Sequence, residues 1–108
     1  MMKVELLSGA CGAEISGMDL RDTSTENINK IKNLLYEHKV IFFRNQDINH
    51  QEQIDFSKCF GPIEKHAYVK GLTEYPEILR IVKEPFEKNN WGENWHSDVS
   101  YNLEPTLA

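Results

Sequence analysis

Hydrophobic positions near the start of the chain alternate in the way that is typical of short strands. Residues 4–7 are mostly apolar, and residues 13–17 alternate between apolar and polar side chains before a glycine. A period of two places side chains on one face of a strand. The pattern therefore predicts two weak strands that form a small opening hairpin.

Two later segments have the spacing and the end signals of helices. Residues 23–26, TSTE, match a capping box and precede apolar positions at helical spacing, which predicts a helix that ends near His38. Asn49 and Glu52 give a similar signal for a second helix, which Gly61-Pro62 is expected to end. Each helix is expected to bury one apolar face.

Three further segments have strand character. Residues 40–43, VIFF, are continuously apolar, which predicts a strand buried on both faces. Residues 78–82 predict another strand, and alternation returns at residues 95–101, where a last strand is expected to begin. Residues 64–75 are mixed in character and predict a loop.

Composition agrees with one folded domain. The chain has 108 residues, of which 40% are hydrophobic and 27% charged. Lysine and arginine number 12 against 17 aspartate and glutamate, without a block of like charge, so neither nucleic acid nor a membrane is expected as a partner. No segment reaches the roughly 18 apolar residues of a membrane span, and a cytoplasmic location is expected. Cys11 and Cys59 have no metal-ligand spacing and are expected to be free thiols.

The sharpest candidate for chemistry is the sequence His96-Ser97-Asp98. Alternate residues of a strand share a face at about 6.5–7 Å, so an imidazole and a carboxylate can converge on one metal ion. One more imidazole would complete the 2-His-1-carboxylate set that binds Fe(II). The alternative is a surface strand with two polar residues in water. Trp95 is either a core or rim aromatic or a wall of an iron site.

Four motifs, in order along nearly the whole chain, resemble the TauD/TfdA family of taurine dioxygenase-like enzymes. They are NWHSDVSY at residues 94–101, GAEISGMDL at residues 12–20, HKVIFFRNQ at residues 38–46, and Phe60-Gly61 with His66 downstream. The resemblance implies a mainly β fold with flanking helices, namely part of a double-stranded β-helix, the jelly roll or cupin-like barrel.

The resemblance also implies an Fe(II)- and 2-oxoglutarate-dependent dioxygenase, in which His96 and Asp98 bind the iron. With 2-oxoglutarate and O2 as cosubstrates, such an enzyme hydroxylates its substrate and releases succinate and CO2. His38 and His50 lie at helix ends and are not expected to touch the metal. Arg44 resembles an anion clamp, but a structural salt bridge is the preferred interpretation.

His66 matches the family histidine that faces the anionic group of the substrate, although a loop histidine in solvent is the alternative. Tyr68 and Asn94 are further candidates for substrate contact. A small anionic substrate of the sulfonate, aryloxyacid or alkyl sulfate type is expected. Val69 and Gly92 replace a tyrosine and an asparagine of the taurine enzymes, which argues against taurine itself.

The remaining iron histidine of the family, its 2-oxoglutarate arginine and its cofactor threonine are expected beyond Ala108. Residues 1–108 are therefore expected to be the N-terminal portion of a single domain. For the full-length protein, a homo-oligomer is one of the assembly states left open. The alternative is a non-catalytic module that binds metal at most weakly through two ligands.

Overall fold

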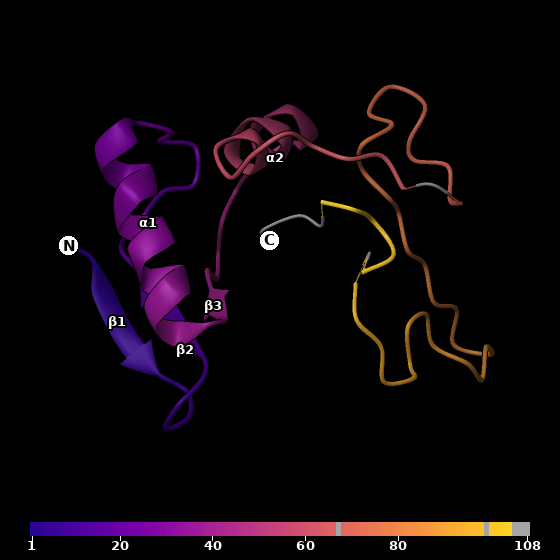
Figure 1. Cartoon of the computed structure of the whole chain (residues 1–108), viewed down its shortest axis with the longest axis horizontal. Helices are drawn as coiled ribbons and strands as arrows, with labels where there is room; N and C mark the ends of the chain where they lie inside the picture. The colour runs from indigo at the N-terminus through magenta and orange to yellow at the C-terminus, as the bar shows by residue number, and fades with distance from the viewer. Residues whose placement is uncertain (67, 99, 105–108) are drawn as a thin grey trace. The chain divides into compact units, whose positions relative to one another are not determined.

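The computed structural model describes residues 1–66, 68–98 and 100–104. The chain divides into an N-terminal unit, Met1–Cys59, and a C-terminal unit, Phe60–Ala108. Within the described residues, every helix and strand lies in the N-terminal unit (Figure 1). Each unit is therefore taken by itself.

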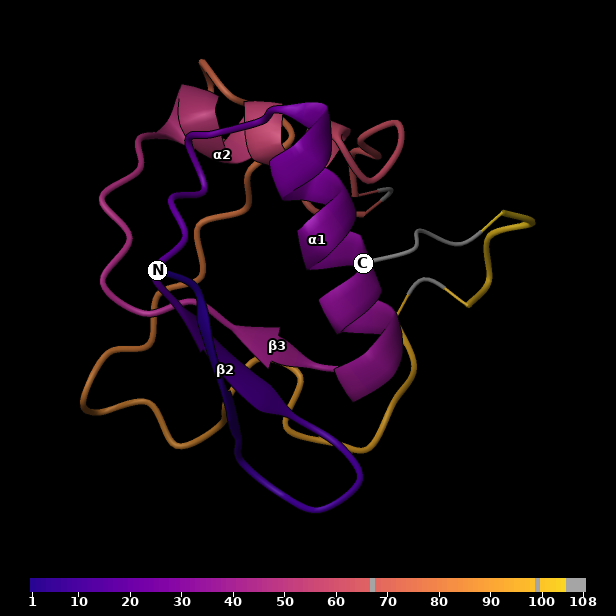
Figure 2. The ribbon, with the colours of Figure 1, turned by 90° about the vertical axis from the view of Figure 1, so that its left-hand side faces the viewer.

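A three-stranded sheet forms the base of the N-terminal unit. β1 (Lys3–Leu6) pairs antiparallel with β2 (Ala13–Ser16), which confirms the predicted hairpin. β2 also pairs with β3 (Ile41–Phe42), and this pair is parallel. Parallel neighbours need a long crossover, which α1 (Thr25–His38) provides. Figure 2 shows α1 beside the strands that it connects.

Apolar side chains of β2 and α1 make the core of this unit. Ile15 and Ile31 are each 1% exposed, and burying a side chain of this size stabilises a fold by about 1.5–3 kcal/mol. The buried apolar set is Ala13, Ile15, Leu20, Ile28, Ile31 and Ile54.

The start of α1 differs from the predicted capping box. Ser24, not Thr23, is the N-cap, and its side chain accepts a hydrogen bond from the backbone N–H of Asn27. With Ser24 as the N-cap, Glu26 stands one position before the one a capping box uses, and its carboxylate binds Lys30 at 2.7 Å. The predicted end is confirmed, since α1 ends at His38.

The second predicted helix is confirmed as α2 (His50–Lys58). Asn49 Oδ1 accepts from the backbone N–H of Glu52 at 2.8 Å, and Glu52 Oε2 accepts from the backbone N–H of Asn49 at 2.9 Å. This reciprocal pair satisfies two of the free N–H groups at the helix start.

The prediction of a doubly buried strand at residues 40–43 is wrong. β3 has two residues, and Phe42 is 43% exposed. Within the described residues β3 pairs only with β2 and forms an edge of the sheet. In the part of the chain that the structure describes, one edge of this segment has no strand partner and Phe42 is partly exposed.

Two polar side chains hold the chain after β3 against the rest of the unit. Arg44 Nε donates to Glu14 Oε2 at 2.8 Å, which confirms the structural salt bridge. Gln46 Nε2 donates to the carbonyl oxygen of Met18 at 3.1 Å, and Gln46 Oε1 accepts from the backbone N–H of Leu20 at 3.1 Å. After β3 ends, side-chain hydrogen bonds rather than strand pairing connect the chain to residues 14–20.

The predicted strands at residues 78–82 and 95–101 are not formed by the described residues of these segments, and Val99 lies outside them. A strand needs a neighbouring backbone to satisfy its N–H and C=O groups. The backbone of Ile78 instead closes local turns, since its N–H bonds to Tyr75 and its carbonyl accepts from Leu72. Ile81 and Val82 are exposed.

The described residues are a small α/β structure rather than a mainly β one. Their helices have 14 and 9 residues and their strands have 4, 4 and 2. In the part of the chain that the structure describes, no helix has the length and apolar character to cross a membrane. Cys11 and Cys59 are free thiols, as predicted.

Candidate metal and substrate site

His96 and Asp98 lie together although no strand forms around them. His96 Nε2 is 3.1 Å from Asp98 Oδ1, and the two side chains are 51% and 89% exposed. Residues 94–98 have irregular backbone with bends at 94 and 98, so the contact of the imidazole and the carboxylate does not depend on the strand that was expected there. The expected pair is present, and its expected backbone geometry is not.

The backbone of Asn94 orients the His96 ring. His96 Nδ1 lies 2.6 Å from the Asn94 carbonyl oxygen, so Nδ1 carries a proton and Nε2 is left toward Asp98. This hydrogen bond, followed by the negative charge of Asp98, raises the pKa of His96 above its ordinary value. Sequence reasoning singled out the Asn94 side chain, whereas the structure uses its carbonyl group.

The two donor atoms fit a divalent cation. Ligand bonds of about 2.1 Å at a right angle place two neighbouring donors about 3.0 Å apart. Nε2 and Oδ1 form an ion pair at 3.1 Å, a distance that is compatible with that separation. A hydrogen bond from the other ring nitrogen to a carbonyl is a frequent support of a metal-binding histidine. Among the described residues no group of three His, Cys, Asp or Glu side chains forms a larger metal cluster.

Gly92 lies directly beside the His96 ring. Its φ is +66°, a backbone conformation that residues other than glycine rarely adopt. A Cβ at this position would also come within 3.3 Å of His96 Cε1. The departure from the asparagine of the taurine enzymes thus has a local consequence, because a side chain here would crowd the histidine.

His66 is held by the backbone that follows it. Its Nδ1 accepts hydrogen bonds from the N–H groups of Tyr68 at 3.1 Å and Val69 at 3.2 Å. Because Nδ1 accepts these two bonds, the ring atom left to donate a hydrogen bond is Nε2. Nε2 is the atom that a hydrogen-bond acceptor of a substrate would meet.

Tyr68 stands beside His66 on the surface of the C-terminal unit. Tyr68 is 81% exposed, and its ring meets the His66 ring edge-on, with centroids 6.2 Å apart. Tyr101, three positions after Asp98, lies on from Tyr68 with centroids 5.9 Å apart. Trp95 is fully exposed, so its interpretation as a core aromatic is wrong within the described residues.

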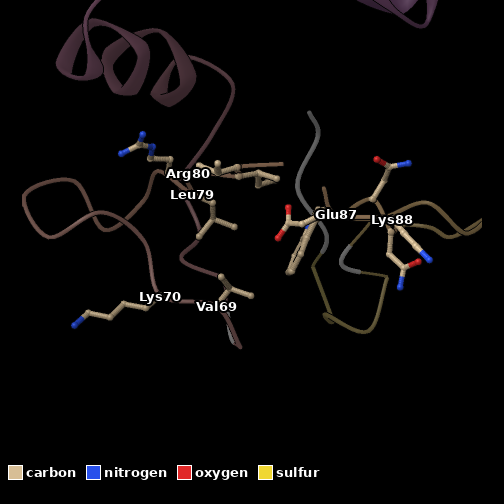
Figure 3. A pocket seen from close by; sticks show the side chains of 11 residues that line it. Val69, Lys70, Leu79, Arg80, Glu87 and Lys88 are labelled. Atoms are coloured by element: carbon tan, nitrogen blue, oxygen red, sulfur yellow. The ribbon is translucent and has the colours of Figure 1, made fainter. Parts of the chain in front are cut away.

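A separate cavity of about 600 Å³ lies in the same unit. Figure 3 shows that the side chains of Lys70 and Arg80 extend away from those of Val69 and Leu79. The cationic groups of Lys70 and Arg80 at this cavity therefore do not converge on one point. His66, His96 and Asp98 are not among the residues that line it.

The family model described as "Taurine catabolism dioxygenase TauD, TfdA family" matches residues 3–108. The chain belongs to the TauD/TfdA family. Within this TauD/TfdA chain the match includes every residue singled out above for metal or substrate contact.

Individual relatives agree with this family. An alkylsulfatase of Acinetobacter baylyi is 32% identical over 93% of this chain and 31% of its own length. An alpha-ketoglutarate-dependent sulfate ester dioxygenase of Pseudomonas putida is 31% identical over 93% of this chain and 33% of its own. A taurine dioxygenase structure from Burkholderia xenovorans matches with a TM-score of 0.63 and 31% identity, over 69% of this chain and 28% of that one. This TauD/TfdA chain thus spans about a third of the length of these curated relatives.

Proposed function

We propose that this chain is the N-terminal part of an Fe(II)- and 2-oxoglutarate-dependent dioxygenase, with His96 and Asp98 as two of the three protein ligands of the iron. The observation that carries the proposal is the 3.1 Å approach of His96 Nε2 to Asp98 Oδ1, with Nδ1 occupied by the Asn94 carbonyl, inside a TauD/TfdA chain. A carboxylate and an imidazole are the ligand types that non-haem Fe(II) oxygenases use.

The third ligand and the groups that hold 2-oxoglutarate belong, in this proposal, to residues outside the chain. The chain's share of about a third of its relatives' length supports this division. In this proposal the residues outside the chain also complete a jelly-roll barrel. Segments 78–82 and 95–101 would gain there the backbone partners that a strand requires.

Bound iron with 2-oxoglutarate and O2 supplies the oxidation of a substrate C–H group, coupled to formation of succinate and CO2. The chain's own residues then bind and orient. Asn94 fixes the ring of His96, and the carboxylate of Asp98 offsets part of the metal's charge. His66 donates a hydrogen bond from Nε2 to the anionic group of the substrate, because its Nδ1 is occupied by two backbone N–H groups.

The proposed substrate is a small organic sulfate ester, sulfonate or aryloxyacid. Two curated relatives are named for alkyl sulfate and sulfate ester chemistry, and a sulfate group offers the acceptor oxygens that the His66 donor needs. Taurine itself is not proposed, since Val69 and Gly92 replace residues of the taurine enzymes.

A metal titration of the chain tests the ligand assignment. Mn(II), a redox-stable substitute for Fe(II), is added and free Mn(II) is followed by electron paramagnetic resonance. His96→Ala and Asp98→Ala are expected to weaken binding, whereas His50→Ala in the N-terminal unit is expected to leave it unchanged. Equal binding by the His96→Ala chain and the parent chain would show that His96 is not a ligand.

The activity is tested on the longer protein that carries this chain. Succinate formation from 2-oxoglutarate is expected to require Fe(II) and an organic sulfate, and to be lost in both ligand variants. Metal binding without any substrate-dependent succinate would favour the non-catalytic two-ligand module instead.

A further inference from the structure

Two side-chain contacts join the segment that carries His66 to the segment that follows Asp98. Asn102 Nδ2 donates a hydrogen bond to Glu64 Oε2 at 2.8 Å, across 38 positions of the chain. The rings of Tyr68 and Tyr101 lie 5.9 Å apart at an angle of 59°. Glu64 and Tyr68 stand two positions before and two positions after His66.

These contacts matter because the backbone of the C-terminal unit makes few distant connections. Among its described residues, the backbone–backbone hydrogen bonds join near neighbours in sequence, and the widest runs from the Leu72 N–H to the Ile78 carbonyl. Neither strand pairing nor helix packing ties residues 64–68 to residues 101–102 there. Side chains therefore hold the two segments together.

The orientation of His66 depends on the same short segment. The N–H groups that fix its Nδ1 belong to Tyr68 and Val69, and the Tyr68 ring meets the imidazole edge-on. A movement of residues 64–69 would thus move the Nε2 donor with them.

We infer that the Glu64–Asn102 hydrogen bond and the Tyr68–Tyr101 ring pair form a clamp that ties the segment of the His66 donor to residues 101 and 102, which closely follow His96 and Asp98 in the sequence. Glu64 and Asn102 are positioning residues for substrate binding. The inference rests on the proposed function for the role of His66, and its structural part stands on the contacts alone. No sequence signal marks these residues, because a glutamate and an asparagine 38 positions apart form no recognisable motif.

Amide exchange in the 108-residue chain tests the clamp without any activity. Glu64→Ala and Asn102→Ala are each expected to accelerate exchange of the Tyr68 and Val69 N–H groups about fivefold, and the double variant no further, since both remove one hydrogen bond. Glu64→Gln retains an acceptor oxygen and is expected to exchange like the parent chain. Glu74→Ala, at another exposed glutamate of the unit, is the matched control.

Kinetics of the longer protein test the positioning role. With hexyl sulfate as the probe, Glu64→Ala is expected to raise KM about fivefold while kcat and Mn(II) affinity stay unchanged, and Glu64→Gln is expected to restore KM. An unchanged KM, or a parallel loss of Mn(II) affinity, would overturn the positioning role.

The two proposals fail in different ways. Unchanged exchange rates in both alanine variants would overturn the clamp whatever the activity. Absence of succinate from the parent protein with hexyl sulfate, hexanesulfonate and phenoxyacetate would overturn the proposed function, and the exchange rates would still decide the clamp.

Discussion

Replacement of Gln46 by alanine is expected to destabilise the N-terminal unit more than is usual for a side chain outside the apolar core. The amide bonds to the Met18 carbonyl and the Leu20 N–H at 3.1 Å each, and Leu20 is only 7% exposed. At about 1 kcal/mol for each of the two hydrogen bonds, Gln46→Ala costs about 2 kcal/mol. That loss corresponds to a fall in Tm of about 8–16 °C for a unit of this size.

Thermal unfolding followed by circular dichroism at 222 nm measures this change, because both helices lie in the N-terminal unit. Gln53→Ala, at an exposed glutamine of α2, is the matched control and is expected to change Tm little. Gln46→Met keeps the length of the side chain without its amide. If Gln46→Met unfolds at the parent temperature, packing and not hydrogen bonding explains the role of Gln46, and the reasoning is refuted.

Two further predictions concern the proposed ligand pair, His96 and Asp98, and the start of α1. Gly92→Ala is expected to weaken Mn(II) binding about fivefold, because it strains a positive φ and crowds His96. Gly9→Ala is the control, since a Cβ at that position meets open space. Equal Mn(II) affinity of the two variants would contradict the crowding. The pKa of Asp22 is lowered, mainly by the hydrogen bond from a backbone N–H at the start of α1. A lowered folded-state pKa gives stability that is present above the unfolded-state pKa of about 3.9 and is lost as pH falls through the folded-state pKa. Tm is therefore expected to drop in that acidic range, and to drop less in Asp22→Asn. Equal slopes of Tm against pH in the two proteins would contradict this role of Asp22.

Local signals in the sequence were sufficient for the elements whose contacts are local. α2 is capped by the predicted Asn49 with the predicted reciprocal bond to Glu52, because a capping box is complete within four residues. The same signal was one residue out of register at Thr23, because Ser24 caps α1 and Glu26 therefore does not occupy the third helical position. Pattern alone does not decide which of two neighbouring hydroxyl residues becomes the cap.

Strand predictions depended instead on partners that a pattern cannot show. Residues 40–43 and 78–82 have strand composition, but hydrogen bonding to a neighbour decides whether a strand forms. The site had a mixed outcome for a similar reason. The spacing of His96 and Asp98 indicated a pair, whereas the Asn94 carbonyl that orients His96 is a backbone group and leaves no trace in the residue types.

The crossover from β2 through α1 to β3 has a consequence for the order in which the protein is made. Both strands of this parallel pair and the helix that connects them lie within the first 42 residues of the chain, and the N-terminal unit ends at Cys59. Domains generally fold as units during synthesis, beginning with the N-terminal one. We expect this unit to begin folding on the ribosome before His96 and Asp98 emerge, so the two proposed iron ligands follow a structure that is already forming.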